Sequence, residues 1–133
     1  MKRKISLSMC CIAAFSVLIT ALMISLVLYN RNYKNMTNYI QNEAEYMAAA
    51  MNYNGVEYLD SVKDVSPSRI TWIANDGNVI FDNSGKKMEN HSDRSEFKEA
   101  IKSGIGESSR LSETLGKKTY YYCLLYTSDA ADD

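Results

Sequence analysis

The sequence predicts an α+β protein, in which an N-terminal transmembrane helix continues into a long helix and precedes a small antiparallel sheet with a short helix. Three observations support this fold class. Residues 5–29 carry no charge, and neither Gly nor Pro occurs before Gly55. After residue 69, short runs rich in β-branched and aromatic residues alternate with turn residues.

The uncharged segment Ile5–Tyr29 is long enough to cross a bilayer, since a transmembrane helix needs roughly 20 apolar residues. The hydrophobic part of a cleaved signal peptide is usually shorter. We therefore expect an uncleaved signal anchor, with a secreted domain behind a cleavable leader as the alternative. Basic residues at positions 2–4 predict a cytoplasmic N-terminus and an extracytoplasmic bulk at the cell membrane, although Arg31 and Lys34 weaken this bias.

The helix is expected to continue beyond the membrane, because nothing breaks it before Gly55. Apolar residues recur along this continuation in steps of three and four, the period of one helix face. They are Tyr33, Met36, Ile40, Ala44, Met47 and Met51. The stripe is expected to pack on the protein's own domain, and its spacing also fits a short heptad seam between two copies. Asn52–Gly55 should end the helix, and residues 56–68 should form a connector with Tyr58 and Leu59 in the core.

A β-hairpin is expected next. The runs Arg69–Asn75 and Asn78–Asp82 are rich in strand-forming residues, and Asp76-Gly77 joins them. An Asp-Gly pair between two strands favours a two-residue type I′ turn, in which both central residues have positive φ. The cross-strand pairs expected in that register are Trp72 with Phe81, Ile73 with Ile80 and Ala74 with Val79.

A short helix and two strands are expected in the remaining part of the domain. Ser92 or Asp93 can cap a helix over about Arg94–Ser103, because both residue types accept hydrogen bonds from the first backbone N–H groups of a helix. The buried stripe of this helix should be Phe97, Ala100 and Ile101. Glu107–Ser112 and Thr119–Tyr122 are predicted to be strands joined by a glycine-containing turn.

Composition excludes several kinds of site. The net charge is −1, so no basic surface argues for nucleic acid as a partner. Cys10 and Cys11 lie in the apolar segment and Cys123 stands apart, so no disulfide or metal-binding set is expected. His91 is the single histidine and is expected on an exposed loop. No phosphate-binding loop or catalytic triad pattern occurs, so we expect no catalytic, cofactor-binding or metal residues.

A pocket for a small ligand is the candidate site. It would lie between the sheet and the segment Met88–Lys102, and such a pocket needs aromatic walls and a few polar anchors. The candidate lining residues are Trp72, Arg94, Arg110, Tyr120 and Tyr122. For each of them, core packing or a place on the surface is the alternative.

Two stretches of the sequence resemble a known family. RITWIANDGNVIFDN, residues 69–83, matches the pattern RITxIxxDGxVxxD. The segment Met88–Tyr122 is similar to MENHxxRPEVxEAxxxGxGxxxRxSxTLGxxxxYY, with Ser95 in place of the proline. Residues 1–122 thereby resemble the N-terminal part of phosphate-regulon-type sensor histidine kinases of Gram-positive bacteria. The resemblance implies a PAS-like extracytoplasmic sensing domain of the PDC or Cache type, truncated before its last strands.

A complete member of that family would add a second transmembrane helix, a phospho-accepting histidine and an ATP-binding catalytic domain. The resemblance therefore implies a two-component sensor kinase that lies in membrane lipid, uses ATP and Mg and acts on a response regulator. It also implies a homodimer through the transmembrane and juxtamembrane helices. No position of this chain matches the kinase motifs, so the chain by itself should be inactive and hold no cofactor. The alternative is the sensing module of a chemoreceptor or another non-kinase receptor.

The C-terminal residues 123–133 resemble the in-frame translation of a sequencing adapter, so we expect the natural sequence to differ after Tyr122. The expected organisation has four parts. They are a cytoplasmic N-terminus at 1–4, a transmembrane helix at 5–29, an incomplete extracytoplasmic sensing domain at 30–122 and a tail of foreign origin at 123–133.

Overall fold

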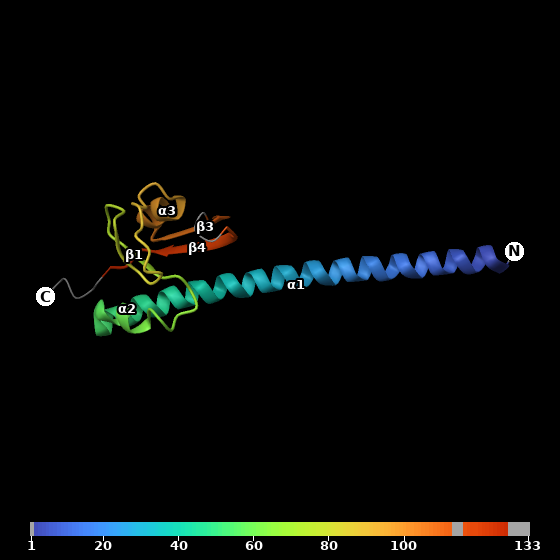
Figure 1. Cartoon of the computed structure of the whole chain (residues 1–133), viewed down its shortest axis with the longest axis horizontal. Coiled ribbons are helices and arrows are strands. Elements are labelled where there is room, and N and C mark those ends of the chain that lie inside the picture. The colour runs from blue at the N-terminus through green and yellow to red at the C-terminus, as the bar shows by residue number, and fades with distance from the viewer. Residues whose placement is uncertain (1, 113–115, 128–133) are drawn as a thin grey trace. The chain divides into compact units, whose positions relative to one another are not determined.

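The computed structural model describes residues 2–112 and 116–127 and has the expected α+β architecture (Figure 1). Its elements are α1 (Lys2–Asn54), α2 (Glu57–Val62), β1 (Thr71–Ile73), β2 (Val79–Asp82), α3 (Ser95–Ser103), β3 (Ile105–Leu111) and β4 (Lys118–Leu124). The chain forms two compact units, Met1–Asn38 and Tyr39–Asp133.

α1 is a single helix of 53 residues, as the absence of Gly and Pro predicts. In the first unit, the large apolar side chains between Ile5 and Tyr29 are 46–68% exposed. Within the described residues, α1 is the one helix long and apolar enough to cross a membrane. The helix ends where expected, because Gly55 has a φ of +71° and its N–H donates to the Met51 carbonyl at 2.9 Å.

The second unit begins with the C-terminal part of α1, whose apolar stripe packs on the unit as expected. Met51 is 7% exposed, and Ile40, Ala44 and Met47 are half-buried. Tyr33 and Met36, which belong to the first unit, are exposed. The connector predicted over residues 56–68 contains a short helix, α2. Leu59 is buried at 3% exposure and holds α2 in place, while Glu57 and Asp60 in its first turn suit the positive end of the helix dipole.

The β1–β2 hairpin has the expected strands but not the expected turn. The Ala74 N–H donates to the Asn78 carbonyl at 2.8 Å, and the Gly77 N–H donates to the Ala74 carbonyl at 2.9 Å. The loop therefore has three residues rather than two. Gly77 has a φ of +86°, whereas Asp76 has a negative φ, so a turn that ends in an αL glycine replaces the predicted type I′ turn.

The longer loop shifts the register by one residue, and a bulge shifts it back. Ile73 pairs with Val79, so the predicted pairs of Ile73 with Ile80 and of Ala74 with Val79 are wrong. Ile80 is the extra residue of the bulge and is 55% exposed. Beyond the bulge, Trp72 pairs with Phe81 as predicted. Because side chains alternate along a strand, the two irregularities cancel and keep this aromatic pair on one face.

α3 begins one residue later than expected and lacks the predicted cap. Its N-cap residue is Arg94, which makes no side-chain capping hydrogen bond, so neither Ser92 nor Asp93 is the cap. The Ser92 N–H instead donates to the side-chain oxygen of Asn90 at 2.8 Å. The buried residues of α3 are Glu96, Phe97 and Ala100. Ile101, which was expected in the buried stripe, is 45% exposed. The buried face of α3 is formed by Glu96, Phe97 and Ala100, and Ile101 lies at its edge.

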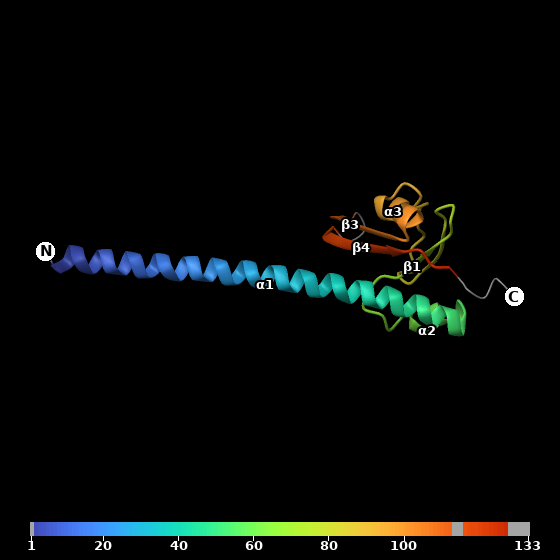
Figure 2. The same ribbon diagram turned by 180° about the vertical axis from the view of Figure 1, so that it is seen from behind.

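β3 and β4 form an antiparallel hairpin with unbroken register. α3 packs on this hairpin and lies beside it in both views (Figures 1 and 2). Gly106 allows the close approach, because a Cβ there would lie 1.9 Å from the Glu96 carbonyl oxygen. β4 extends to Leu124, so the strand end predicted at Tyr122 is wrong. Strand pairing uses backbone N–H and C=O groups, which every non-proline residue has. The strand therefore continues into Cys123 and Leu124, the first residues of the predicted tail.

The two hairpins form separate two-stranded sheets within the described residues, whereas the sequence predicts one antiparallel sheet. β1 and β2 are short, at three and four residues, and the bulge interrupts their pairing. A bulge increases local twist and disrupts the ladder of hydrogen bonds, so these strands offer a poor edge for further pairing.

Candidate functional site

The structure distributes the five candidate pocket residues over different surfaces of the second unit. Arg110 lies on β3 and faces α3, whereas Tyr120 and Tyr122 lie on β4 and face the opposite side of the hairpin. Trp72 lies on β1 and Arg94 is the N-cap residue of α3, both half-buried. The five side chains therefore do not gather around one cavity, and their role as ligand contacts stays a prediction.

Arg110 binds a buried carboxylate on α3. Its terminal nitrogens donate to the two oxygens of Glu96 at 2.5 Å and 2.6 Å, and the Ser108 hydroxyl also donates to Glu96 at 2.8 Å. The guanidinium carbon lies 4.0 Å from the centre of the Tyr121 ring, which is a cation–π contact. The cluster joins α3 to both strands of the hairpin.

The pKa of Glu96 reflects this environment. Burial by itself raises the pKa, but the hydrogen bonds from Arg110 and Ser108 outweigh burial and lower it to about 2. The side chain is 8% exposed and charged. Sequence reasoning missed Glu96, although its position next to Phe97 on the buried stripe of a predicted helix was a usable signal, because an ionisable residue on such a stripe needs a partner.

Gln41 connects α1 to the opposite face of the hairpin. Its amide nitrogen donates to the Tyr120 hydroxyl and to the Glu107 carboxylate, each at 3.0 Å. Burial and the charge of Glu107 raise the pKa of Tyr120, against a lowering by the Gln41 bond. Burial and the charges of Glu45 and Glu107 raise the pKa of Tyr122. Both phenols therefore stay neutral, so Tyr120, Tyr122 and Glu107 offer hydroxyl groups and a carboxylate on this face.

A second polar contact joins α1 to the segment that leads into β1. Glu43 accepts hydrogen bonds from the hydroxyls of Ser66, at 2.7 Å, and Ser68. Gln41 and Glu43 are polar residues next to the apolar stripe of α1. Helical periodicity locates the covered face, but it does not show which polar residues at its edge find partners.

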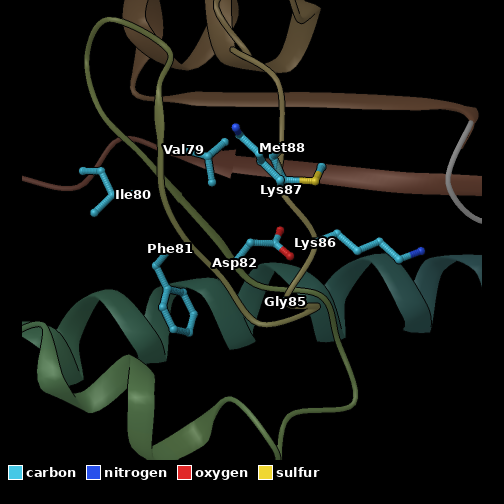
Figure 3. A pocket seen from close by; sticks show the side chains of 8 residues that line it. All are labelled: Val79, Ile80, Phe81, Asp82, Gly85, Lys86, Lys87 and Met88. Carbon is cyan, nitrogen blue, oxygen red and sulfur yellow. The ribbon is translucent and has the colours of Figure 1, made fainter.

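A surface hollow of about 480 Å³ lies between β2 and the loop that follows it (Figure 3). Its lining residues are Val79, Ile80, Phe81, Asp82, Gly85, Lys86, Lys87 and Met88. The ammonium ends of Lys86 and Lys87 point apart, so they do not form a cradle for an anion (Figure 3). The five predicted pocket residues lie elsewhere.

The carboxylate that lines this hollow already has partners. Asp82 accepts hydrogen bonds from Arg69 Nε at 3.0 Å, from the Thr71 hydroxyl at 2.7 Å and from the Ser84 hydroxyl. Burial raises the pKa of Asp82, but these bonds outweigh burial and lower it below its usual value. Asp82 therefore fixes the start of the hairpin and the turn after β2, which is a structural role.

His91 is buried at 8% exposure, so the prediction of an exposed loop histidine is wrong. Its Nδ1 lies 2.7 Å from the Glu89 carbonyl oxygen, and its backbone N–H donates to the Gly77 carbonyl at 2.7 Å. The loop packs back on the hairpin turn and thereby covers the ring. Burial lowers the pKa of His91, and the positive charge of Arg94 acts in the same direction. Within residues 2–112 and 116–127, no three His, Cys, Asp or Glu side chains gather as metal ligands.

Comparison with known proteins identifies the family of this domain. Residues 30–132 match the Single Cache-like family, while no curated protein and no solved structure matches the chain. Cache domains are extracytoplasmic sensing modules of sensor kinases and chemoreceptors. Together with the apolar segment of α1, the match is consistent with a single-pass membrane protein. Since the match covers more than half of the sequence, the chain belongs to the Single Cache-like family.

Proposed function

We propose that this chain is the extracytoplasmic input part of a membrane-bound two-component sensor histidine kinase, of the phosphate-regulon type found in Gram-positive bacteria. The motifs in residues 69–83 and 88–122 support the kinase class, and the family match supports sensing outside the cytoplasm. In this proposal residues 1–4 are cytoplasmic and residues 5–29 cross the membrane. The cytoplasmic output part would use ATP and Mg and would act on a response regulator.

The continuity of α1 is the observation that carries the proposal. One helix of 53 residues contains both the apolar segment and the residues Gln41 and Glu43. These two side chains bind the part of the second unit that follows α1, which we call the sensing unit. At about 1.5 Å per residue, an unbroken helix transmits a displacement along its axis without a hinge to absorb it. A ligand that moves the β3–β4 hairpin or the segment at residues 66–68 would therefore displace α1.

The proposal is tested in the full-length parent protein. A Glu43→Ala substitution disturbs the sensing unit without any ligand, and autophosphorylation in membrane vesicles reports the output. In the unbroken helix this substitution should change the basal rate. Insertion of Gly-Gly next to Asn42, on the membrane side of Glu43, should abolish that effect because it introduces a flexible joint.

The same insertion after Gly85 is the matched control, because that turn lies outside α1 and has open space around it. The control should leave the effect of Glu43→Ala on autophosphorylation intact. If the insertion in α1 also leaves it intact, transmission along this helix is refuted.

A chemoreceptor with the same sensing module is the second candidate, because Cache domains serve both classes. The gene downstream of Tyr122 separates the two: a phospho-accepting histidine box identifies the kinase, and a long methyl-accepting coiled coil identifies the chemoreceptor. N-terminal sequencing of the mature protein tests the third possibility, a secreted domain released from a cleavable leader.

A further inference from the structure

We propose that protonation of His91 at acidic external pH releases residues 88–92, which we call the strap, from the β1–β2 hairpin. The strap forms neither helix nor strand and lies between the turn after β2 and the start of α3. His91 is its one buried residue, at 8% exposure, whereas Met88 is half-buried and the other three are exposed. Burial of a single titratable ring is therefore a main part of what holds the strap in place.

The strap is also tied to the hairpin turn by hydrogen bonds between groups that do not titrate. The Asn90 amide nitrogen donates to the Asp76 carbonyl at 3.0 Å and to the Asn78 side-chain oxygen at 2.9 Å. The His91 backbone N–H donates to the Gly77 carbonyl at 2.7 Å. The two bonds of Asn90 are exposed, so water can replace them and the strap can open without unfolding of the whole unit.

The His91 ring has a hydrogen-bond partner at one of its two nitrogens. Its Nδ1 lies 2.7 Å from the Glu89 carbonyl oxygen. Because a carbonyl oxygen only accepts, the neutral ring carries its proton on Nδ1, and a second proton must go to Nε2. Among the described residues, none hydrogen-bonds Nε2. The charged ring in the closed strap would lose contact with water and gain no new hydrogen bond from the protein.

The charged groups around the ring together oppose its protonation. Arg94 and Glu96 at the start of α3 and Arg69 before β1 act on the ring. Burial lowers the pKa of His91 most, and the two guanidinium groups act in the same direction, against the hydrogen bond of the ring and the Glu96 carboxylate. Arg110 binds both oxygens of Glu96, so this carboxylate is not free to turn towards a protonated ring.

Two other charged groups near the strap are also held in place. Arg69 Nε donates to Asp82 at 3.0 Å, and its Nη2 donates to the Met88 sulfur at 2.7 Å. Its positive charge therefore stays at the base of the strap. On the hairpin turn, the Asp76 carboxylate accepts the Asn78 backbone N–H at 3.0 Å and the Asn78 amide at 2.7 Å. This carboxylate is committed to its own turn and does not compensate a charge on His91.

The closed and released strap therefore differ in proton affinity. In the released strap the ring lies in water and has about the ordinary pKa of 6.5. Since the pKa is lower in the closed strap, opening takes up a proton. The closed strap is fully stable above about pH 6.5 and loses stability as the pH falls from there to the pKa of the closed form. Glu96 and Asp82 remain charged in this range, because their pKa values are lower still.

Release of the strap alters the surface of the sensing unit. Met88 belongs both to the strap and to the wall of the hollow beside β2, so opening removes part of that wall. External acidity would thereby reach the sensing unit as an input, without a small-molecule ligand. The inference rests on the proposed function only in placing the strap outside the cytoplasm.

Nuclear magnetic resonance of the full chain in lipid nanodiscs tests the first step. His91 is the only histidine, so a chain prepared without a histidine tag gives one imidazole signal that needs no assignment. Its titration midpoint should lie below about 6.5. A midpoint at or above that value overturns the proposal, because the closed strap would then not oppose protonation.

Hydrogen exchange in the same sample tests the release. Protection of the His91 backbone N–H, relative to an unstructured peptide at the same pH, should fall by up to about tenfold per pH unit below about pH 6.5, because opening takes up one proton. The internal control is the Asn83 N–H, which donates to the Ile70 carbonyl of the same hairpin at 3.1 Å and should keep its protection. Constant protection at His91, or an equal fall at Asn83, overturns the proposal.

Two variants separate the charge of the ring from the other bonds of the strap. His91→Asn keeps a donor for the Glu89 carbonyl and cannot take up a proton, so protection of residue 91 should no longer depend on pH. Asn90→Ala is the matched control: it removes bonds that do not titrate, so it should lower protection at every pH and leave the pH dependence intact. A pH dependence that persists in a folded His91→Asn variant overturns the proposal.

If His91→Asn unfolds the unit, as read by Trp72 fluorescence, Arg94→Gln serves in its place. Arg94 makes no side-chain capping bond to α3, so the change should remove a positive charge near the ring and leave the helix intact. The midpoint of His91 should then rise towards about 6.5, and the loss of protection in acid should become smaller. An unchanged midpoint overturns the proposal. All of these readouts work without kinase activity, so failure of the strap is distinguishable from failure of the proposed function.

Discussion

Arg110 on β3 donates to both carboxylate oxygens of Glu96 on α3, at 2.5 Å and 2.6 Å. The side chains are 31% and 8% exposed, respectively, so the pair is largely shielded from water. The free energy gained by forming such a pair is small, because burial removes both charges from water. The loss of one partner is costly, because it leaves the other charge buried and unpaired.

Replacement of Arg110 by Met should therefore lower the free energy of unfolding by about 3 kcal/mol. Trp72 is the only tryptophan, so its fluorescence during denaturant titration of the full chain in detergent reports the sensing unit alone. The exposed pair of Lys98 and Asp93, at 3.3 Å, offers the control, since Lys98→Met should cost little. Similar small losses in both variants would show that the buried pair does not hold α3.

Acid should weaken the same pair over a defined pH range. The pKa of Glu96 is about 2 in the folded chain, against an ordinary value of 4.5. The unfolded state takes up more protons as the pH falls, so the stabilisation is complete above about pH 4.5 and is lost progressively towards about pH 2. Glu96→Gln should flatten this dependence. The lowered pKa of Asp82 should leave a residual slope, and a slope identical to that of the unaltered chain would contradict the prediction.

Gly106→Ala should destabilise the unit by about 3 kcal/mol, because the new methyl group would meet the Glu96 carbonyl oxygen at 1.9 Å and overpack the contact between α3 and β3. The control is Gly55→Ala, where φ is +71° but nothing lies within 4 Å, so only the backbone cost of about 1 kcal/mol remains. Thermal unfolding followed by Trp72 fluorescence compares the two. A larger loss of stability in Gly55→Ala than in Gly106→Ala would contradict the prediction.

Glu43→Ala should free the segment at residues 66–68 by removing the acceptor of two serine hydroxyls, at a cost of about 1–3 kcal/mol. Hydrogen exchange of the backbone N–H groups near Ser66 and Ser68 should accelerate. Glu45 is exposed two residues away, so Glu45→Ala is the control and should leave these rates unchanged. Slow exchange in the Glu43 variant would mean that other contacts order the segment.

Several features of the fold follow from local sequence and were predicted correctly. The length of α1 follows from the lack of Gly and Pro, and its end follows from Gly55. The position of the β1–β2 hairpin follows from strand-forming runs around a turn. Each of these signals lies within a few residues of the feature that it predicts.

The turn, the cap and the candidate site depend on neighbours that are distant in sequence. Asp-Gly is compatible with both a two-residue and a three-residue loop, and the bulge at Ile80 is what reconciles the observed loop with the aromatic pair. His91 is buried because its loop returns to Gly77, and nothing local to His91 indicates that return. The five candidate pocket residues were chosen by side-chain type, and the alternation of β3 and β4 places Arg110 and the two tyrosines on opposite faces.

The sequence by itself therefore determined the apolar segment, the unbroken helix, the α+β class and the resemblance of the domain to the Cache type. These properties depend on composition and short-range periodicity. Only the tertiary structure decided that Glu96 pairs with Arg110, that Gln41 and Glu43 hold α1 to the sensing unit, and which side of α1 stays uncovered. The physical reason is that a polar side chain is satisfied by whatever partner the fold brings near it, and that partner can come from any part of the chain.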